Sequence, residues 1–285
     1  MKEHKVLKTQ LEPLRNFLKK NSINEREVAF IKSYLSNITF ISGLTYKTTI
    51  QKLQRVSINK RLFGGANNRI EEISFLKNPP KQCVKKYGRA NSPNESVLYA
   101  TFEPLTALSE MRPDIGDFIT VSTWKLKDNH PITVSPIFKN APKAHKVQNE
   151  VSIKALFMYN QQVKQYDEEL QKQLDVIIQF VADCFSKEVD DTNHFDYFLS
   201  SFYANRIFWE LQDGEIDAIL YPSVRQSLEL TNIVMKPDVF NKHYELELVE
   251  ESIVKQNKNH FSSGWYMLGT GYSKTFDDEI IAWKN

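Results

Sequence analysis

Glycine is scarce in this chain, which has 9 glycines among 285 residues where an average protein has roughly 7%. Folds that hold the phosphates of a nucleotide on a glycine-rich turn need patterns such as GxGxxG or GxxxxGK[ST], and neither pattern occurs in the sequence. The chain is therefore not expected to adopt a fold built on such a turn. If it handles a nucleotide, side chains such as arginine must hold the phosphates.

Two segments have the periodicity of amphipathic helices. Residues 1–40 predict a helical hairpin, with Pro13 at the start or at a kink of the first helix and a capping box from Ser22 to Glu25 before the second. Residues 149–209 predict further long helices. The apolar stripes behind these predictions are Leu7, Leu11, Leu14 and Leu18; Val28, Ile31, Leu35 and Ile38; and Leu170, Leu174, Ile177, Val181 and Phe185.

The rest of the chain has the pattern of short strands. SVLYATF predicts a strand, and Pro104 suits the first turn of a short helix with Leu105, Leu108 and Met111 on its apolar side. Further strands are predicted for DFITVSTWKL, PITVSPIF, IDAILYPS and YELELVE, and a loop for FSSGWYMLGTGYS. The sequence thus predicts an α+β fold with an N-terminal extension over 1–40, a main domain over 41–285 and a helical insertion over about 149–209.

Composition argues against several classes of partner. The formal net charge is +2, from 37 basic and 35 acidic residues, which gives no electrostatic footprint for nucleic acid or an anionic membrane surface. No apolar run approaches the ~20 residues of a membrane helix, and the charged N-terminus does not resemble a signal peptide. The two cysteines, Cys83 and Cys184, have no CxxC spacing and suit free thiols. We expect a cytoplasmic protein.

A metal site is not expected, because the six histidines are scattered. They form neither an HxxxH pair nor a cluster with cysteine, which are the spacings that bind transition metals. The positions are His4, His130, His145, His194, His243 and His260.

Residues 88–113, GRANSPNESVLYATFEPLTALSEMRP, contain the most informative polar side chains. Arg89 lies in a turn and could bind a phosphate or carboxylate, or form a surface ion pair. Tyr99, in the middle of the predicted strand, could stack on a flat ring or pack in the core. Glu110, on the short helix, would indicate a functional role if buried, or could be solvated or paired with an arginine.

Two other residues are weaker candidates. Ser223 ends the buried strand in ILYPSVR and could bind a substrate with its hydroxyl, or be an ordinary loop serine. No GxSxG elbow surrounds it, which argues against a hydrolase nucleophile. Arg55, in LQRVSIN, lies in an expected early strand and could supply a second cation.

Taken in order, these residues resemble the RES domain, whose members include NAD-degrading toxins of bacterial RES–Xre toxin–antitoxin modules. The matching pattern is a GR-x-N turn, an LY-x-A strand, a T-A-x-x-E helix with R-P, and a later strand ending in serine, here ILYPSVR. The resemblance implies a fold similar to the ADP-ribosyltransferases, a split, twisted β-sheet with surrounding helices and a central NAD cleft.

The resemblance also implies roles for individual residues. Glu110 and Arg89 would be catalytic, the carboxylate at the ribose and the guanidinium at the diphosphate. Tyr99, Ser223, Arg55 and Asn91 would bind substrate, Asn91 as the asparagine of the GR-x-N turn and Arg55 on the weakest match. NAD would be the substrate, with no further cofactor and no metal.

The activity implied is cleavage of the nicotinamide–ribose bond, by an NAD glycohydrolase or phosphorylase acting as a bacterial toxin. A protein mono-ADP-ribosyltransferase using the same pocket is one alternative, and a non-catalytic interaction protein with a vestigial pocket is another. No helix-turn-helix of the Xre type is evident, so an antitoxin would be a separate protein. The additional helices of 1–40 and 149–209 could hold a homo-oligomer, cover the cleft or bind a partner.

Overall fold

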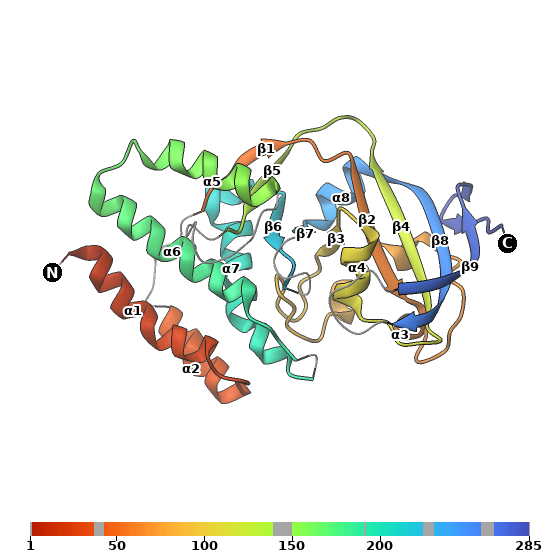
Figure 1. The fold of residues 1–285 in the computed structure, drawn as a ribbon, viewed down its shortest axis with the longest axis horizontal. Helices are drawn as coiled ribbons and strands as arrows, with labels where there is room; N and C mark the ends of the chain where they lie inside the picture. Colours follow the sequence, from red (N-terminus) through yellow and green to blue (C-terminus); the bar gives the residue numbers. More distant parts are fainter. Residues whose placement is uncertain are drawn as a thin grey trace. The chain divides into compact units, whose positions relative to one another are not determined.

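The computed structural model describes residues 2–36, 43–138, 150–190, 192–224, 231–257 and 265–284. Its contacts divide the chain into two compact units, each assembled from three stretches of sequence, and each is described by itself (Figure 1). Unit 1 comprises Met1–Thr48, Lys81–Glu95 and Ile132–Thr231, and unit 2 comprises Thr49–Pro80, Ser96–Pro131 and Asn232–Asn285. The helices of the expected N-terminal extension therefore belong to the same unit as those of the expected insertion.

Unit 1 is mainly helical with a small sheet. Strand β5 pairs with β1 antiparallel and with β6 parallel. The α-helices are α1 (Glu3–Leu18), α2 (Glu25–Leu35), α5 (Glu150–Val163), α6 (Glu168–Ser186) and α7 (Phe198–Trp209); the strands are β1 (Tyr46–Thr48), β5 (Ile132–Pro136) and β6 (Ala218–Pro222); short 3-10 turns are η2 (Lys81–Cys83), η3 (His194–Tyr197) and η4 (Leu211–Gly214).

The helices of unit 1 form where the apolar stripes predicted them. Helix α1 packs along α6, as Figure 1 shows, and buries Leu7, Leu11 and Leu14. Pro13 lies inside α1, so the prediction that the helix starts there is wrong: it starts ten residues earlier, at Glu3. In α2, Val28, Ile31 and Leu35 are buried, whereas Ile38 lies outside the described residues.

The capping box of α2 is present but shifted by two residues from the predicted one. Asn24 is the N-cap: its Oδ1 accepts from the backbone N–H of Glu27 (3.1 Å), and Oε2 of Glu27 accepts from the N–H of Asn24 (2.9 Å). The predicted residues Ser22 and Glu25 each lie two positions before the residues that form the box, Asn24 and Glu27. The pattern repeats in this sequence because Asn24 and Glu27 have the same spacing as Ser22 and Glu25.

We therefore expect Asn24→Ala to lower the free energy of unfolding by about 0.5–2 kcal/mol, since it removes the acceptor of an otherwise unpaired helix N–H. Urea unfolding followed by circular dichroism measures the effect. Ser22→Ala, at the predicted but unused position, is the control and should change stability by less than about 0.5 kcal/mol. Equal losses in the two variants would contradict the assignment.

Unit 2 is built on an antiparallel sheet in the order β7-β3-β2-β4-β8-β9. A separate two-stranded ribbon joins β10 to β11. The strands are β2 (Lys52–Ile58), β3 (Leu98–Thr101), β4 (Phe118–Leu126), β7 (Thr231–Met235, in this unit from Asn232), β8 (Tyr244–Asn257), β9 (Trp265–Ser273), β10 (Phe276–Asp277) and β11 (Ile280–Ile281); the helices are α3 (Asn59–Leu62), α4 (Pro104–Met111) and α8 (Pro237–His243), with a 3-10 turn η1 (Ile73–Leu76).

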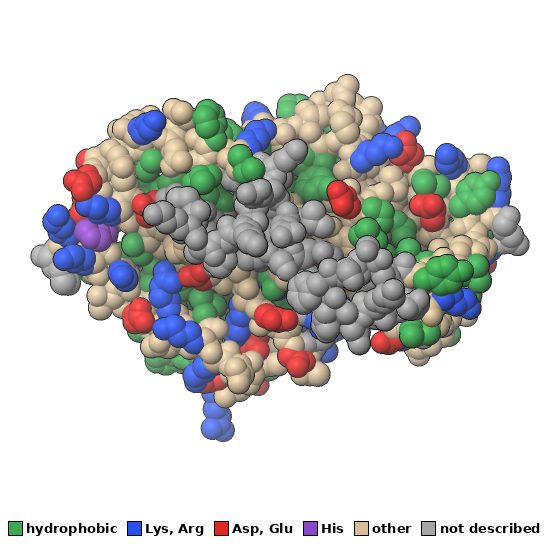
Figure 2. Space-filling view, in the orientation of Figure 1, with side chains coloured by type: hydrophobic (Ala, Val, Ile, Leu, Met, Phe, Trp, Pro, Cys, Tyr) green, Lys and Arg blue, Asp and Glu red, His purple; other side chains and the backbone are tan. Residues whose placement is uncertain are grey.

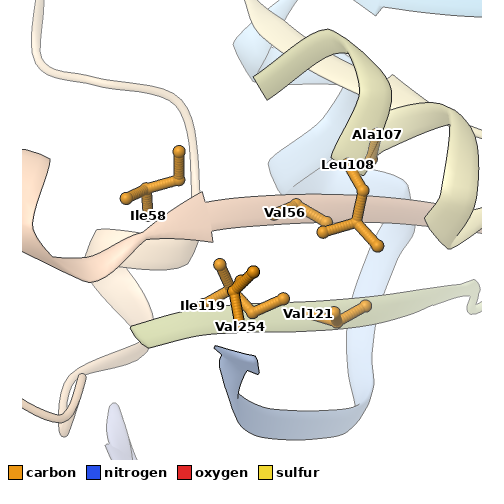
Figure 3. Close-up of a cluster of buried hydrophobic side chains, with 7 residues drawn as sticks. All are labelled: Val56, Ile58, Ala107, Leu108, Ile119, Val121 and Val254. Carbon is orange, nitrogen blue, oxygen red and sulfur yellow. The ribbon is translucent and has the colours of Figure 1, made fainter. Parts of the chain in front are cut away.

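Helix α4 lies on one face of this sheet over an apolar cluster (Figure 3). Its buried Leu108 and Ala107 contact side chains of β2 and β4. Because side chains alternate between the two faces of a strand, every second residue of these strands faces the helix. The helix begins with Pro104 at its first position and ends where Arg112 takes a left-handed φ of 48° before Pro113. The cluster consists of Val56, Ile58, Ala107, Leu108, Ile119, Val121 and Val254.

A buried carboxylate joins β9 to the rest of unit 2. Glu251 on β8 is 1% exposed, and its Oε1 accepts from Nε of Arg69 (2.9 Å) and from the hydroxyl of Thr270 (2.9 Å). Its Oε2 accepts from the amide of Asn59 (3.3 Å), whose own oxygen accepts from the hydroxyl of Thr120 (2.9 Å). Both carboxylate oxygens are thus satisfied inside the protein.

The structure confirms the predicted mixture of helices and strands, and it shows that the strands pair mainly antiparallel. The expected strands and the short helix at Pro104 are present, but Leu105 is 49% exposed and does not belong to the buried side of α4. The loop predicted for 261–273 is wrong from Trp265 onward, because that part is strand β9. Among the described residues, no helix is both long and apolar enough to span a bilayer.

Candidate functional site

The turn that carries Arg89 is held firmly within unit 1. The N–H of Gly88 donates to the carbonyl of Asn91 (3.0 Å), which closes the GR-x-N turn. Nη1 of Arg89 donates to the carbonyls of Phe185 (2.6 Å) and Lys187 (3.2 Å), and its guanidinium carbon lies 5.1 Å from the ring centre of Tyr197. Arg89 therefore caps the C-terminal end of α6, where a cation is favourable.

Asn91 also has a structural role in this turn. It is 6% exposed, and its amide nitrogen donates to the carbonyls of Lys86 and Ser92, both at 3.2 Å. The turn is further held by Glu95, whose Oε2 accepts from the N–H of Ser92 (2.7 Å) and from the amide of Asn205 on α7 (2.5 Å). The contribution of Asn91 to binding a substrate stays a prediction.

Ser223 follows the last residue of β6 and is completely buried. Two residues earlier, the ring of Tyr221 packs on that of Phe185 with centroids 5.6 Å apart. Phe185 is thus a shared neighbour: its carbonyl binds Arg89 and its ring contacts the strand that leads to Ser223. Within unit 1, Arg89 and the strand that leads to Ser223 therefore both contact Phe185 at the end of α6.

In unit 2, Glu110 occupies the last turn of α4 and is held by a residue that the sequence analysis did not single out. The amide nitrogen of Asn232 on β7 donates to Oε1 of Glu110 (2.8 Å). Asn232 is 3% exposed and lies in TNIVM, a buried strand. A polar residue directly before the buried apolar run IVM is the one sequence signal that could have pointed to it.

Asn232 belongs to a line of polar side chains that crosses four neighbouring strands, here called the polar row. The strand registers place Thr123 opposite Gln54, Gln54 opposite Thr101, and Thr101 opposite Asn232. Gln54 lies two residues before Val56, so the row lies on the face that α4 covers. Within it, the amide of Gln54 donates to the hydroxyl of Thr123 (3.4 Å) and the hydroxyl of Thr101 donates to the carbonyl of Glu103 (2.8 Å).

Tyr99 shares this face with Glu110. It precedes Thr101 by two residues on β3, and side chains two apart in a strand point the same way. Tyr99 is half-buried opposite Val234. Unit 2 therefore brings Tyr99, Glu110 and Asn232 to one side of the sheet.

Arg55 lies on the opposite face of the same sheet. It is adjacent in the strand to Val56, which contacts α4, and it donates to the carbonyls of Leu76 (2.7 Å) and Lys77. Burial lowers the pKa of Arg55 to about 10, so the side chain remains protonated at neutral pH. The structure does not bring Arg55 to Glu110, because neighbouring residues in a strand point to opposite faces.

The predicted residues thus form two groups. Arg89, Asn91 and Ser223 belong to unit 1, whereas Tyr99, Glu110 and Arg55 belong to unit 2. Their convergence on a single cleft stays a prediction.

The other features of the described residues do not involve the predicted site residues. A recess of about 700 Å³ between α1 and α6, lined in part by Lys8, Arg15 and Asp183, contains none of the predicted residues. Among described residues, no group of three or more histidine, cysteine or acidic side chains could hold a metal; His145 and His260 lie outside them. On the face drawn in Figure 2, basic and acidic side chains are intermingled.

Comparison with known proteins does not extend the resemblance. No family model matches the chain, and the search of curated proteins finds no significant match. The relation to the RES domain therefore rests on the residues quoted above and stays a prediction.

Proposed function

We propose that this protein is an NAD-consuming enzyme that cleaves the bond between nicotinamide and ribose. The observation that carries the proposal is the carboxylate of Glu110, held by the buried amide of Asn232 on the face of the sheet that also bears Tyr99. The order of these residues in GRANSPNESVLYATFEPLTALSEMRP is the second support.

The chemistry suits a carboxylate oriented by a neutral group. When the bond between C1′ of the ribose and the pyridinium nitrogen breaks, its electron pair leaves with nicotinamide, which becomes neutral. The ribose becomes an oxocarbenium-like cation, and a negative charge held beside it lowers the barrier, as in glycoside hydrolysis. An acceptor oxygen then bonds to C1′ and loses its proton. We propose that Glu110 supplies this charge.

The other assignments are part of the same proposal. Tyr99 would lie near the nicotinamide ribose, and Arg89, Asn91 and Ser223 would bind the rest of the NAD molecule. The N–H groups of Arg89 that are not directed at α6 would serve the diphosphate, since a guanidinium has five donors. No role in NAD binding is proposed for Arg55, which lies on the other face of the sheet.

The wider setting is also proposed from the resemblance. The fold would be a variant of the split, twisted sheet of ADP-ribosyltransferases, and the protein a cytoplasmic bacterial toxin neutralised by a separate antitoxin of the Xre type. Growth arrest with falling intracellular NAD after induced expression would agree with this setting.

The test is incubation of the purified protein with NAD, with and without phosphate, followed by mass analysis. Free ADP-ribose indicates a glycohydrolase, its phosphate ester at the same ribose carbon a phosphorylase, and an added ADP-ribosyl mass on a protein a transferase. Each of these products supports cleavage of the nicotinamide bond. Unchanged NAD in all mixtures, including induced cells, would overturn the proposal and favour an interaction protein.

A further inference from the structure

The contact between Asn232 and Glu110 determines how the side-chain amide of Asn232 is oriented. An ionised carboxylate only accepts hydrogen bonds, so the amide must present its nitrogen to Glu110 and its oxygen elsewhere. Among the described residues, Oδ1 of Asn232 is buried without a hydrogen-bond partner. The two residues that follow Asn232 on β7, Ile233 and Val234, are both fully buried.

This arrangement is unfavourable for stability taken alone. A buried acceptor without a partner costs free energy that an apolar residue of similar size would avoid, and the three residues that follow Asn232 on the strand are apolar. Gln54, in the same polar row, also has a buried oxygen without a partner, Oε1. Polar groups kept at such a cost occur preferentially where function needs them.

We propose that Asn232 is a positioning residue for Glu110, an inference that rests on the proposed NAD cleavage. It fixes the position of the carboxylate by a hydrogen bond from strand β7 of the sheet to Oε1 of Glu110. A neutral amide does this without cancelling the negative charge, whereas an arginine or lysine at 2.8 Å would form an ion pair and oppose stabilisation of a cation.

The test compares Asn232→Ala and Asn232→Asp with the wild type. Asn232→Ala removes the donor, and kcat/KM for NAD should fall about 10- to 100-fold, the effect of losing one hydrogen bond to a charged group. Asn232→Asp is nearly isosteric but places a second carboxyl against Glu110. Since two adjacent carboxyls share a proton, the acidic limb of the pH–rate profile should move up by about one pH unit or more.

A general destabilisation of the fold would lower the rate at every pH without moving that limb. Among the described residues, the ionisable side chains on the elements next to α4 and Asn232 are unchanged in both variants: Lys52 and Arg55 on β2, Tyr99 on β3, Arg112 after α4 and Lys236 after β7. Asn67→Asp is the matched control, because Asn67 also belongs to unit 2 and donates through its amide, to the carbonyl of Gly116 (3.1 Å). It should leave the profile unchanged.

A readout without turnover separates this inference from the proposed function. Carbon-13 labelling of glutamate carboxyls, with Glu110 assigned by its loss in Glu110→Gln, follows its titration in the wild type and in Asn232→Asp. If the wild type does not cleave NAD but the titration moves in Asn232→Asp, the proposed function fails and the positioning contact stands. Unaltered titration and an unaltered acidic limb in folded Asn232→Asp, or normal kcat/KM in Asn232→Ala, would overturn the inference.

Discussion

Glu110→Gln should reduce release of nicotinamide from NAD by about a thousandfold or more while the protein remains folded. Glutamine keeps the length and shape of the side chain, and its oxygen can still accept from the amide of Asn232, so the contact across α4 and β7 can persist. What is lost is the negative charge beside the developing cation, and electrostatic groups of this kind each contribute about 10²–10³-fold or more. Chromatographic measurement of nicotinamide over time gives the rate.

The control for this variant is Glu103→Gln at the other end of the same helix. Glu103 is the N-cap residue of α4, is exposed, and makes no side-chain cap hydrogen bond. It should retain wild-type turnover. Circular dichroism and the thermal midpoint establish that both variants are folded. Near-normal turnover in Glu110→Gln, relative to the wild type, would show that Glu110 does not take part in the chemistry.

Glu251→Ala should lower the free energy of unfolding by about 3 kcal/mol, the low end of the range for removing one partner of a buried ion pair, because Glu251 is buried but the Arg69 side chain is 29% exposed. The change leaves the guanidinium of Arg69 without its carboxylate and takes an acceptor from Thr270 and Asn59. These groups join β8 and β9 to the chain around residues 59–69, so the loss affects several contacts at once. Urea unfolding followed by circular dichroism measures it.

Glu250→Ala gives a closely matched comparison. Glu250 precedes Glu251 on β8 and is exposed, so the same substitution is made on the opposite face of the same strand. A change within about 0.5 kcal/mol is expected there. Similar losses in the two variants would show that the buried network does not carry the stability we assign to it.

Local patterns predicted the part of the candidate site that lies within one stretch of chain. The alternation of SVLYATF and the proline that follows placed β3 and α4 correctly, and with them Tyr99 and Glu110. This works because a strand followed at once by a helix is determined by short-range periodicity and by the fixed φ of proline.

Contacts between distant segments could not be predicted in the same way. Glu110 meets Asn232, 122 residues away, and Arg89 meets the carbonyl of Phe185, 96 residues away. The face on which Arg55 lies depends on the position of Val56 under α4, which is a matter of sheet register rather than of composition. The predicted position of the capping box of α2 was wrong for a different reason, since the two overlapping pairs Ser22/Glu25 and Asn24/Glu27 have the same spacing.

The interleaving of the two units along the chain has a consequence for protein synthesis. The chain passes between them at 48/49, 80/81, 95/96, 131/132 and 231/232, so a ribosome completes unit 1 while unit 2 still lacks β8. Until that strand emerges from the ribosome, one edge of β4 is unpaired and the buried contacts of Glu251 cannot form. A nascent chain that stops before Asn232 would lack β8, and the exposed edge of β4 would make it prone to aggregate.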